Sequence, residues 1–330
     1  MSDNLSNNSP DVNDIPSKGT SACPANSIKP LAYLHREHSP TRAVYISGHM
    51  NRLTFLKRTA ILAGAASVGV GAYTFCWEPH WVEFVRVSLP LSNLPDSLVG
   101  KRLVQLTDLH IGPEVSDDFL KETFAAVNRL APDFVVYTGD LTSYDGDHCP
   151  QAQRMFPHLP KGKLGTFGVL GNHDYGINWA QEEVAEETAA IARDSGVQIL
   201  RNSAAEAAGL QIIGLDDLWA EQFTPEKILP SVSLRKPTLV LSHNPDTADL
   251  PGWDGYRGWI LSGHTHGGQC KPPFLPPPLL PVKNRRYTAG QFQLTNHRKM
   301  YISRGVGHLL QVRFNVRPEV TVFTLQAEST

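Results

Sequence analysis

The sequence predicts a layered α/β domain that extends from about residue 81 to residue 330. Two observations predict this class. Short apolar runs alternate with segments of helical periodicity in the first part of this region, as they do in βαβ units, and the final part contains only runs with strand character. The composition agrees, because 41% of the 330 residues are hydrophobic and 19% are charged, which is ordinary for a protein with a sizeable core.

The first elements alternate between strand and helix. RLVQLTD (102–108) is an apolar run that predicts a buried strand, and the amphipathic segment 117–132 predicts a helix that ends before a proline. DFVVYTGD (133–140) and LGTFGVLGNHD (164–174) predict the next two strands. The segment 181–196 predicts a second helix, whose acidic residues indicate a solvated face.

The second half of the domain contains strand signals. Four further strands are predicted in VQIL (197–200), LQIIGLDD (210–217), PTLVLSHNPD (237–246) and YRGWILSGHTH (256–266). The last two apolar segments, 291–307 and 319–326, have the pattern of antiparallel strands. The domain therefore begins with parallel βαβ-type units and ends in antiparallel strands.

Residues 1–49 form a separate N-terminal tail. The tail is rich in Ser, Asn, Asp and Pro and has few large apolar residues, so it cannot bury enough surface to offset the entropy of ordering. We therefore expect it to be disordered. Because Met50 opens a more conventional N-terminus, it is an alternative start of translation to Met1.

Residues 50–80 predict a signal-anchor, or transmembrane, segment. A basic cluster of Arg52, Lys57 and Arg58 precedes Thr59–Trp77, which contains no charged residue. At about 1.5 Å per residue, such a helix spans most of a hydrocarbon layer of about 30 Å. Because no A-x-A cleavage site follows the apolar run, we expect the anchor to remain uncleaved. A buried core helix is the alternative interpretation.

Potential metal ligands stand at the carboxyl ends of five predicted strands, where ligands collect in open α/β sheets. They are Asp108 and His110; Asp140; Asn172, His173 and Asp174; His243; and His264 and His266. Each residue alone has an ordinary explanation as a helix cap, a turn residue or a hydrogen-bonded histidine. Five strand ends that all supply carboxylate, amide or imidazole groups favour one shared site.

These groups point to a particular chemistry. Carboxylate, amide oxygen and neutral imidazole suit Mn²⁺, Fe or Zn²⁺. Seven ligands, the number that remains of these nine residues without His173 and Asp174, exceed the roughly three protein ligands of one catalytic zinc, but they fit two ions that share a carboxylate. Paired ions about 3.5–4 Å apart activate water and stabilise both oxygens of an in-line displacement at phosphorus. The four cysteines are scattered without a C-x-x-C pair, which argues against a thiolate zinc site.

The motifs D-x-H, GD, GNHD, SHNPD and GHTHGGQ, in this order, resemble those of the calcineurin-like metallophosphoesterases over residues 100–325. The tail PPFLPPPLLPVKNRRYTAGQF, with ISRGVG and RFNVRPEV, is similar to a membrane-anchored bacterial branch. That branch contains YaeI/YkuE-like phosphodiesterases and a UDP-2,3-diacylglucosamine pyrophosphatase of lipid A synthesis. The resemblance implies a four-layer α/β/β/α sandwich of residues 81–330, with a dinuclear site between the loops of the sheets.

The resemblance also implies a role for each residue. One ion would be bound by Asp108, His110, Asp140 and His266, and the other by Asp140, Asn172, His243 and His264, so that Asp140 is the bridge. Both ions are expected to be divalent, with Mn²⁺ favoured and Zn²⁺ or Fe as alternatives. His173 would face the scissile phosphate, where it protonates the leaving oxygen or stabilises the transition state. Asp174 would orient His173.

Charge distribution bears on the substrate. Between Asp254 and Glu319 the chain has no acidic residue but ten basic ones: Arg257, Lys271, Lys283, Arg285, Arg286, Arg298, Lys299, Arg304, Arg313 and Arg317. Such an excess attracts an anionic substrate or an anionic membrane surface. The stiff apolar segment PPFLPPPLLPV within it is a candidate wall that meets a lipid tail or the bilayer. The alternative is a packing loop with ordinary solvated lysines.

Three functions remain open. The first is a membrane-anchored hydrolase of phosphodiester or pyrophosphate bonds in a lipid-linked substrate such as UDP-2,3-diacylglucosamine. The second is the same enzyme acting on a soluble or cell-wall phosphodiester, and the third is an inactive anchored binding module. No nucleic-acid partner is expected, because the basic residues lack interleaved aromatic residues.

The basic cluster before the apolar run predicts an inner (cytoplasmic) membrane protein of a bacterium with its catalytic domain on the extracytoplasmic side. A role in lipid A synthesis requires the cytoplasmic face instead. The sequence does not choose between the two orientations.

Overall fold

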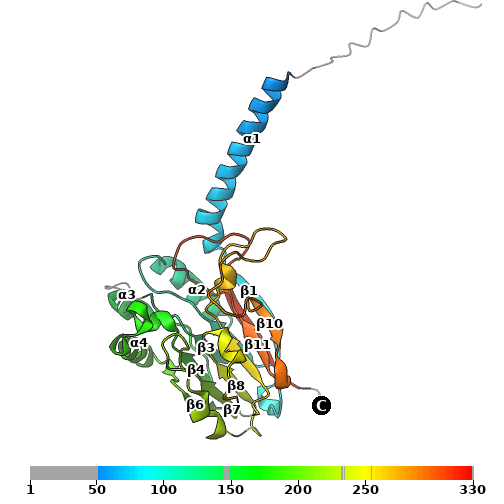
Figure 1. Ribbon diagram of the computed structural model, residues 1–330. Helices are drawn as coiled ribbons and strands as arrows, with labels where there is room; N and C mark the ends of the chain where they lie inside the picture. The colour runs from blue at the N-terminus through cyan, green and yellow to red at the C-terminus, as the bar shows by residue number, and fades with distance from the viewer. Residues whose placement is uncertain (1–50, 144–148, 232, 234, 254, 329–330) are drawn as a thin grey trace, which may run out of the picture. The chain divides into compact units, whose positions relative to one another are not determined.

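Two six-stranded mixed sheets form the body of the protein (Figure 1). The structure is a computed structural model that describes residues 51–143, 149–231, 233, 235–253 and 255–328. The predicted tail, residues 1–49, lies outside the described residues. In spatial order, the first sheet contains β1 (Glu83–Leu91), β12 (Glu319–Ala327), β2 (Arg102–Leu106), β3 (Phe134–Thr138), β4 (Gly165–Val169) and β5 (Gln198–Ile199).

The second sheet contains β10 (Gly290–Gln293), β11 (Lys299–Ile302), β9 (Trp259–Ser262), β8 (Thr238–Leu241), β7 (Leu210–Gly214) and β6 (Ser203–Ala207). Strands β2 to β5 are mutually parallel, as are β7, β8, β9 and β11. Strands β6 and β10 close the edges of the second sheet in antiparallel pairing. Every residue of β3, β7, β8 and β9 is buried, which explains why these strands are nearly continuous apolar runs.

A hydrophobic core lies between the two sheets. It joins side chains of the first sheet, such as Leu103, Phe134 and Phe167, to side chains of the second, such as Ile212 and Leu239. Together, the two sheets and their helices confirm the α/β class.

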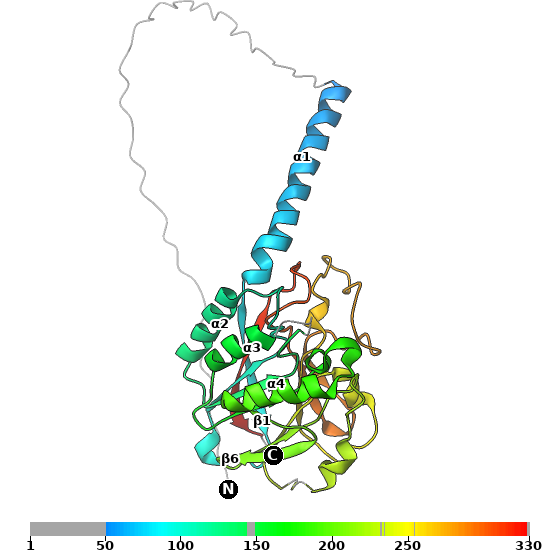
Figure 2. The same ribbon diagram turned by 90° about the vertical axis from the view of Figure 1, so that its left-hand side faces the viewer.

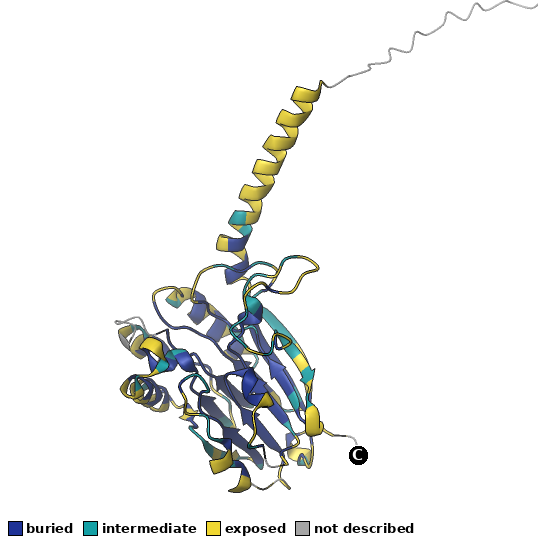
Figure 3. Ribbon diagram, viewed as in Figure 1, coloured by how far each residue is buried: buried dark blue, intermediate teal, exposed yellow. Residues whose placement is uncertain are grey.

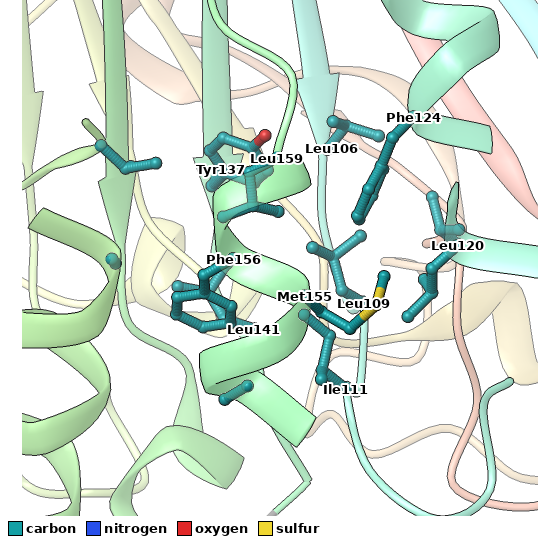
Figure 4. Packing of buried hydrophobic residues seen from close by; sticks show 14 of the residues in the cluster. Leu106, Leu109, Ile111, Leu120, Phe124, Tyr137, Leu141, Met155, Phe156 and Leu159 are labelled. Atoms are coloured by element: carbon teal, nitrogen blue, oxygen red, sulfur yellow. The ribbon is translucent and has the colours of Figure 1, made fainter. Parts of the chain in front are cut away.

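Three α-helices cover the outer face of the first sheet: α2 (Asp117–Arg129), α3 (Cys149–Met155) and α4 (Glu182–Asp194) (Figure 2). Figure 4 shows the packing beneath α2 and α3, where Leu120 and Phe124 of α2 and Met155 of α3 cover Leu106 and Tyr137 of the sheet. Helix α2 begins where the Ser116 hydroxyl accepts the backbone N–H of Phe119 at 3.3 Å.

The outer layer on the second sheet is thinner. In the described residues it consists of short 3₁₀ helices and loops, including η8 (Leu229–Ser231) and η9 (Pro245–Asp249), whose Leu229 and Ala248 join a third buried cluster with Trp253 and Tyr256. Three elements have no counterpart among the sequence predictions: β1, β6 and α3.

Helix α1 (Arg52–Ala72) has no buried residue, as Figure 3 shows, and it continues through a π turn (Tyr73–Trp77) and a 3₁₀ turn (Glu78–His80). The segment Arg52–His80 is long and apolar enough to cross a membrane, and it is the one such helix in the described part of the chain.

The C-terminal end of this helical segment is built into the domain. The fully buried Glu78 carboxylate accepts the backbone N–H groups of Val316, at 2.6 Å, and Asn315, at 2.8 Å. Strand β1 follows directly and runs parallel to β12, which is antiparallel to β2. The segment therefore joins the first sheet at the edge where β2, β3 and β4 end.

Candidate metal centre

The predicted ligands follow their strands at a regular distance. Asp108, Asp140, His243 and His264 each stand two residues beyond the last residue of β2, β3, β8 and β9, respectively, and Asn172 stands three residues beyond β4. Because these strands are parallel within each sheet and the sheets pack face to face, their carboxyl ends meet at one edge.

The first group consists of Asp108, His110 and His266, whose candidate ligand atoms all lie within 4.8 Å of one another. The Nε2 atoms of His110 and His266 are 3.0 Å apart, and His266 Nε2 is 3.3 Å from Asp108 Oδ1. All three residues are buried. The hydroxyl of Ser143 lies 2.8 Å from His110 Nδ1, and this hydrogen bond aims the other ring nitrogen into the group.

The second group consists of Asp140, His243 and His264, again with ligand atoms within 4.8 Å of one another. His243 Nε2 lies 3.2 Å from Asp140 Oδ2 and 3.2 Å from His264 Nδ1. His243 Nδ1 donates to the carbonyl oxygen of Thr138 at 2.7 Å. Asp140 also lies 3.7 Å, by Oδ2, from Nε2 of His110 in the first group. Asp140 thus stands where the two groups meet.

Backbone strain is concentrated at this centre. Asp108, His110, Asp140, His264 and His266 all have φ between 47° and 71°, in the left-handed region. Non-glycine residues rarely adopt this region, and it costs of the order of 1–3 kcal/mol each. The sharp turns that result bring two side chains from each of the segments 108–110 and 264–266 into the centre: Asp108, His110 and His266 into the first group and His264 into the second.

Unpartnered polar atoms test whether a metal ion fits. Both side-chain polar atoms of Asn172 are buried without a hydrogen-bond partner. The neighbour of Asn172, His173, donates its backbone N–H to Asp140 Oδ1 at 2.9 Å. A buried amide without a partner costs free energy, and a cation bound by its oxygen removes part of that cost. The donor set of carboxylate, amide and imidazole therefore fits divalent metal ions.

Burial also favours the neutral form of three of the four imidazoles at the centre; it opposes the charge on His243 as well, but the nearby Asp140 carboxylate raises the pKa of His243 to about 10. Burial raises the pKa of the Asp108 carboxyl to about 7, although the charge of His243 opposes this effect. Burial lowers the pKa of three imidazoles, those of His110, His264 and His266. A neutral imidazole keeps a lone pair for a metal ion.

His173 is half-buried beside the first group. Its ring lies edge-on to that of His110, with centroids 5.2 Å apart. The Asp174 carboxylate accepts hydrogen bonds from the backbone N–H groups of Gly171 at 2.9 Å, Leu141 at 3.2 Å and Thr142 at 2.9 Å.

The bonds of Asp174 join the loop after β3 to the loop after β4. No hydrogen bond from a ring N–H of His173 to the Asp174 carboxylate is among those in the described part of the chain, so these bonds do not include a direct contact by which Asp174 would orient His173. The position of Asp174 gives it a structural role that the motif alone does not reveal.

Two tryptophans flank the centre, and the sequence analysis did not single out either. The rings of Trp179 and Trp219 are 4.6 Å apart between centroids, and Trp219 lies edge-on to His264 at 4.4 Å. Trp179 has φ 58° and lies 6.4 Å from the His173 ring. The two residues are 40 positions apart in the sequence and follow no shared pattern, so only the fold brings them together.

The fold uses half of the ten basic residues between Asp254 and Glu319 internally. Arg298 stacks on Trp253, Lys299 pairs with Glu328, Arg304 pairs with Glu83 and Glu319, Arg313 is buried among backbone carbonyls, and Arg317 stacks on Trp81. The other five are exposed: Arg257, Lys271, Lys283, Arg285 and Arg286. The basic surface is therefore smaller than the sequence count indicates.

Comparisons with known proteins agree with this site. Residues 101–268 match the family described as calcineurin-like phosphoesterase. The chain is 34% identical to the uncharacterized metallophosphoesterase YkuE of Bacillus subtilis, over 84% of this chain and 98% of that protein. It is 32% identical to the phosphodiesterase YaeI of Escherichia coli, over 84% and 99%. It is also 28% identical to the UDP-2,3-diacylglucosamine pyrophosphatase LpxG of Chlamydia trachomatis, over 79% and 94%.

These similarities, together with the two groups of candidate ligands, define a metal-dependent phosphoester hydrolase. The chain belongs to the calcineurin-like phosphoesterase family. The predicted family is thereby confirmed, and membership of it implies divalent metal ions as cofactors.

A glycine tests how tightly the centre is packed. A Cβ atom on Gly263 would collide with Thr107 Oγ1 and Asp108 Oδ2. We therefore expect Gly263→Ala to displace the Asp108 carboxylate and to lower bound divalent metal, measured by elemental analysis of the purified full chain. The control is Gly69→Ala in α1, where a Cβ atom meets nothing within 4 Å. Unchanged metal content in Gly263→Ala would show that Asp108 has room to move.

Proposed function

We propose that this chain is a membrane-anchored, dinuclear metal-dependent hydrolase of phosphodiester or pyrophosphate bonds, acting on a lipid-linked substrate such as UDP-2,3-diacylglucosamine. One observation carries the proposal. The two ligand groups meet at Asp140, at the same sheet edge where the apolar segment Arg52–His80 joins the domain.

The ligands divide between two ions in this proposal. Asp108, His110, Asp140 and His266 hold one, and Asp140, Asn172, His243 and His264 hold the other. The 3.2 Å and 3.7 Å approaches of Asp140 Oδ2 to His243 and His110 support its role as the shared ligand. When bound, such ions activate water and neutralise charge on the phosphoryl group. We propose Mn²⁺ as the native ion, with Zn²⁺ or Fe as alternatives.

His173 acts on the substrate in this scheme. Its half-buried ring stands beside His110 and Trp179, so its free nitrogen can reach a phosphoester in the centre. There it donates a proton to the leaving oxygen or a hydrogen bond to the charge that develops in the transition state. The hydrogen bond from its backbone N–H to Asp140 fixes its distance from the ligands.

Two features support a lipid-linked substrate. LpxG, 28% identical to this chain, is named for hydrolysis of UDP-2,3-diacylglucosamine, whose acyl chains keep it at a membrane. The segment Arg52–His80 gives this chain the means to remain there. YaeI, named a phosphodiesterase, supports the alternative of a soluble or cell-wall phosphodiester.

We further propose that α1 spans the bacterial inner membrane with the domain on the extracytoplasmic side. The basic residues Arg52, Lys57 and Arg58 lie at its N-terminal end, and basic residues stay on the cytoplasmic side of a membrane helix. This orientation conflicts with a lipid A precursor as the substrate, because such a precursor requires the domain on the cytoplasmic face. An extracytoplasmic domain would act on another lipid-linked phosphoester, so the orientation decides between these substrates.

Substitution of the shared ligand and of the proposed acid should have different effects. Asp140→Asn should abolish metal-dependent hydrolysis and reduce bound metal at both positions. His173→Ala should retain bound metal but lose a factor of about 10²–10⁴ in rate, the contribution typical of a general acid. Turnover of bis-p-nitrophenyl phosphate and elemental analysis measure both effects. Asp96→Asn and His297→Ala, at exposed positions, are the controls. Loss of metal in His173→Ala would make His173 a ligand and contradict its assigned role.

The substrate class is tested with detergent-solubilised full chain. We expect Mn²⁺-stimulated turnover of UDP-2,3-diacylglucosamine to exceed that of bis-p-nitrophenyl phosphate, because acyl chains add contacts that a small ester lacks. Both substrates are assayed with and without Mn²⁺. Turnover of the small ester alone would favour the soluble phosphodiester.

Orientation is tested with reporters fused after Thr330. An alkaline phosphatase fusion should be active and a green fluorescent protein fusion dark, because the basic cluster holds the N-terminal end of α1 in the cytoplasm. Replacing Arg52, Lys57 and Arg58 with Ser should weaken this preference. A fluorescent fusion with inactive phosphatase would place the domain in the cytoplasm.

A further inference from the structure

Five large apolar side chains project from two loops outside the sheets. Phe274, Leu275 and Leu279 belong to the proline-rich loop 271–283, and Leu309 and Leu310 belong to the loop 308–312. Phe274 is fully exposed, and Leu279 and Leu310 are 78% and 62% exposed. We call these five residues the apolar rim. Exposed apolar side chains that form a contiguous patch on a protein surface mark an interaction site.

The two loops that carry the apolar rim lie at the end of the domain from which α1 leaves, as Figures 1 and 2 both show. The side chain of Gln311 donates to the carbonyl oxygen of Phe75 at 2.9 Å. The backbone N–H of Arg313 donates to the carbonyl oxygen of Thr74 at 3.1 Å. Phe75 and Trp77 are themselves exposed. The rim therefore continues the apolar surface of the predicted membrane segment.

The loops of the rim also contact the candidate metal centre. His264 Nε2 lies 2.8 Å from the carbonyl oxygen of Pro281, at the base of the proline-rich loop. At the base of the other loop, the backbone N–H of Gly307 donates to the carbonyl oxygen of Asp108 at 2.7 Å. Gln269, three residues after His266, links the two sides by donating to the carbonyl of Leu310 at 3.2 Å.

Positive charge surrounds the proline-rich loop. Lys271 and Lys283 bound it, and Arg285 and Arg286 follow, all four exposed. Arg285 also braces the loop by donating to the carbonyl oxygens of Pro277 and Pro278 at 3.1 Å each. An apolar tip framed by cationic side chains matches the interface of a bilayer with anionic headgroups.

We propose that the apolar rim lies in the interfacial layer of the same bilayer that α1 crosses, with Lys271, Lys283 and Arg286 against anionic headgroups. The candidate metal centre then opens at the bilayer surface, where the phosphate of an amphiphile is already at the right depth. This inference rests on the proposed membrane anchoring, and it adds a second membrane contact that fixes the direction of the site.

The test uses the full chain with its four cysteines replaced by Ser, reconstituted in nanodiscs of phosphatidylcholine and phosphatidylglycerol. The fluorophore NBD is attached at Phe274→Cys or at Leu310→Cys. The matched control is Val99→Cys, an exposed apolar position before the start of β2, at the opposite edge of the first sheet. Lipids that carry a nitroxide on the acyl chain should quench NBD at 274 and at 310 but not at 99.

The quenching experiment tests the membrane contact of the rim independently of the hydrolase proposal, because quenching does not depend on turnover. Unquenched NBD at both rim positions overturns the inference, even if the enzyme is active. Blue-shifted emission without lipid quenching, with self-quenching when two labelled chains share a disc, would assign the rim to a second copy and also overturn it.

A functional readout follows. The variant Phe274→Ser, Leu275→Ser, Leu279→Ser should lose turnover of an amphiphilic phosphodiester in nanodiscs and keep its turnover of bis-p-nitrophenyl phosphate. Equal turnover of the amphiphile by the variant and the parent chain would contradict a role of the rim in substrate capture.

Discussion

The fold must hold several buried carboxylate and imidazole side chains close together at one centre, and the rest of the structure depends on this requirement. Five residues of this centre adopt left-handed backbone conformations, and burial disfavours the charged form of Asp108 by raising the pKa of its carboxyl. Neither cost is tolerable in an isolated loop. Each ligand segment is therefore held at the end of a strand whose last four residues are buried, and a bound cation would offset the charge and satisfy the unpartnered amide of Asn172.

Hydrogen bonds from residues outside the ligand groups hold the ligand loops in place. Asp174 ties the loop that carries Asp140 to the loop that carries Asn172. On the other side, the buried Arg313 donates to the carbonyl oxygen of Gly307 at 2.7 Å, and Gly307 bonds to the backbone of Asp108. The backbone of Arg313 also contacts Thr74, at the C-terminal end of the helical segment Arg52–His80. The ligand loops and the end of this helical segment thus share a single hydrogen-bonded framework.

Much of the fold and of the centre follows from the sequence, because buried parallel strands are apolar runs and polar residues at their ends are conspicuous. The elements that were missed lack such signals. Strand β6 reads SAAEA, which has low strand propensity, and it forms by antiparallel pairing with β7. The Trp179–Trp219 pair depends on the left-handed backbone conformation of Trp179, which no local sequence pattern predicts. The sequence also does not show the interaction partners of Arg298, Arg304 and Arg313. The count of basic residues between Asp254 and Glu319 therefore overestimated the positively charged surface.

The composition of loop 271–283 has a consequence for its solvation. Six of its thirteen residues are proline, and proline has no backbone N–H. In hydrocarbon, every amide hydrogen without an acceptor is costly, which normally keeps irregular chain out of lipid. This loop lacks almost half of the amide hydrogens that a chain of its length would have. Arg285 already donates hydrogen bonds to two of its carbonyl oxygens. The loop therefore loses few hydrogen bonds to water when it leaves water. The proline content of this loop would therefore lower the free-energy cost of transferring a non-helical segment from water into lipid.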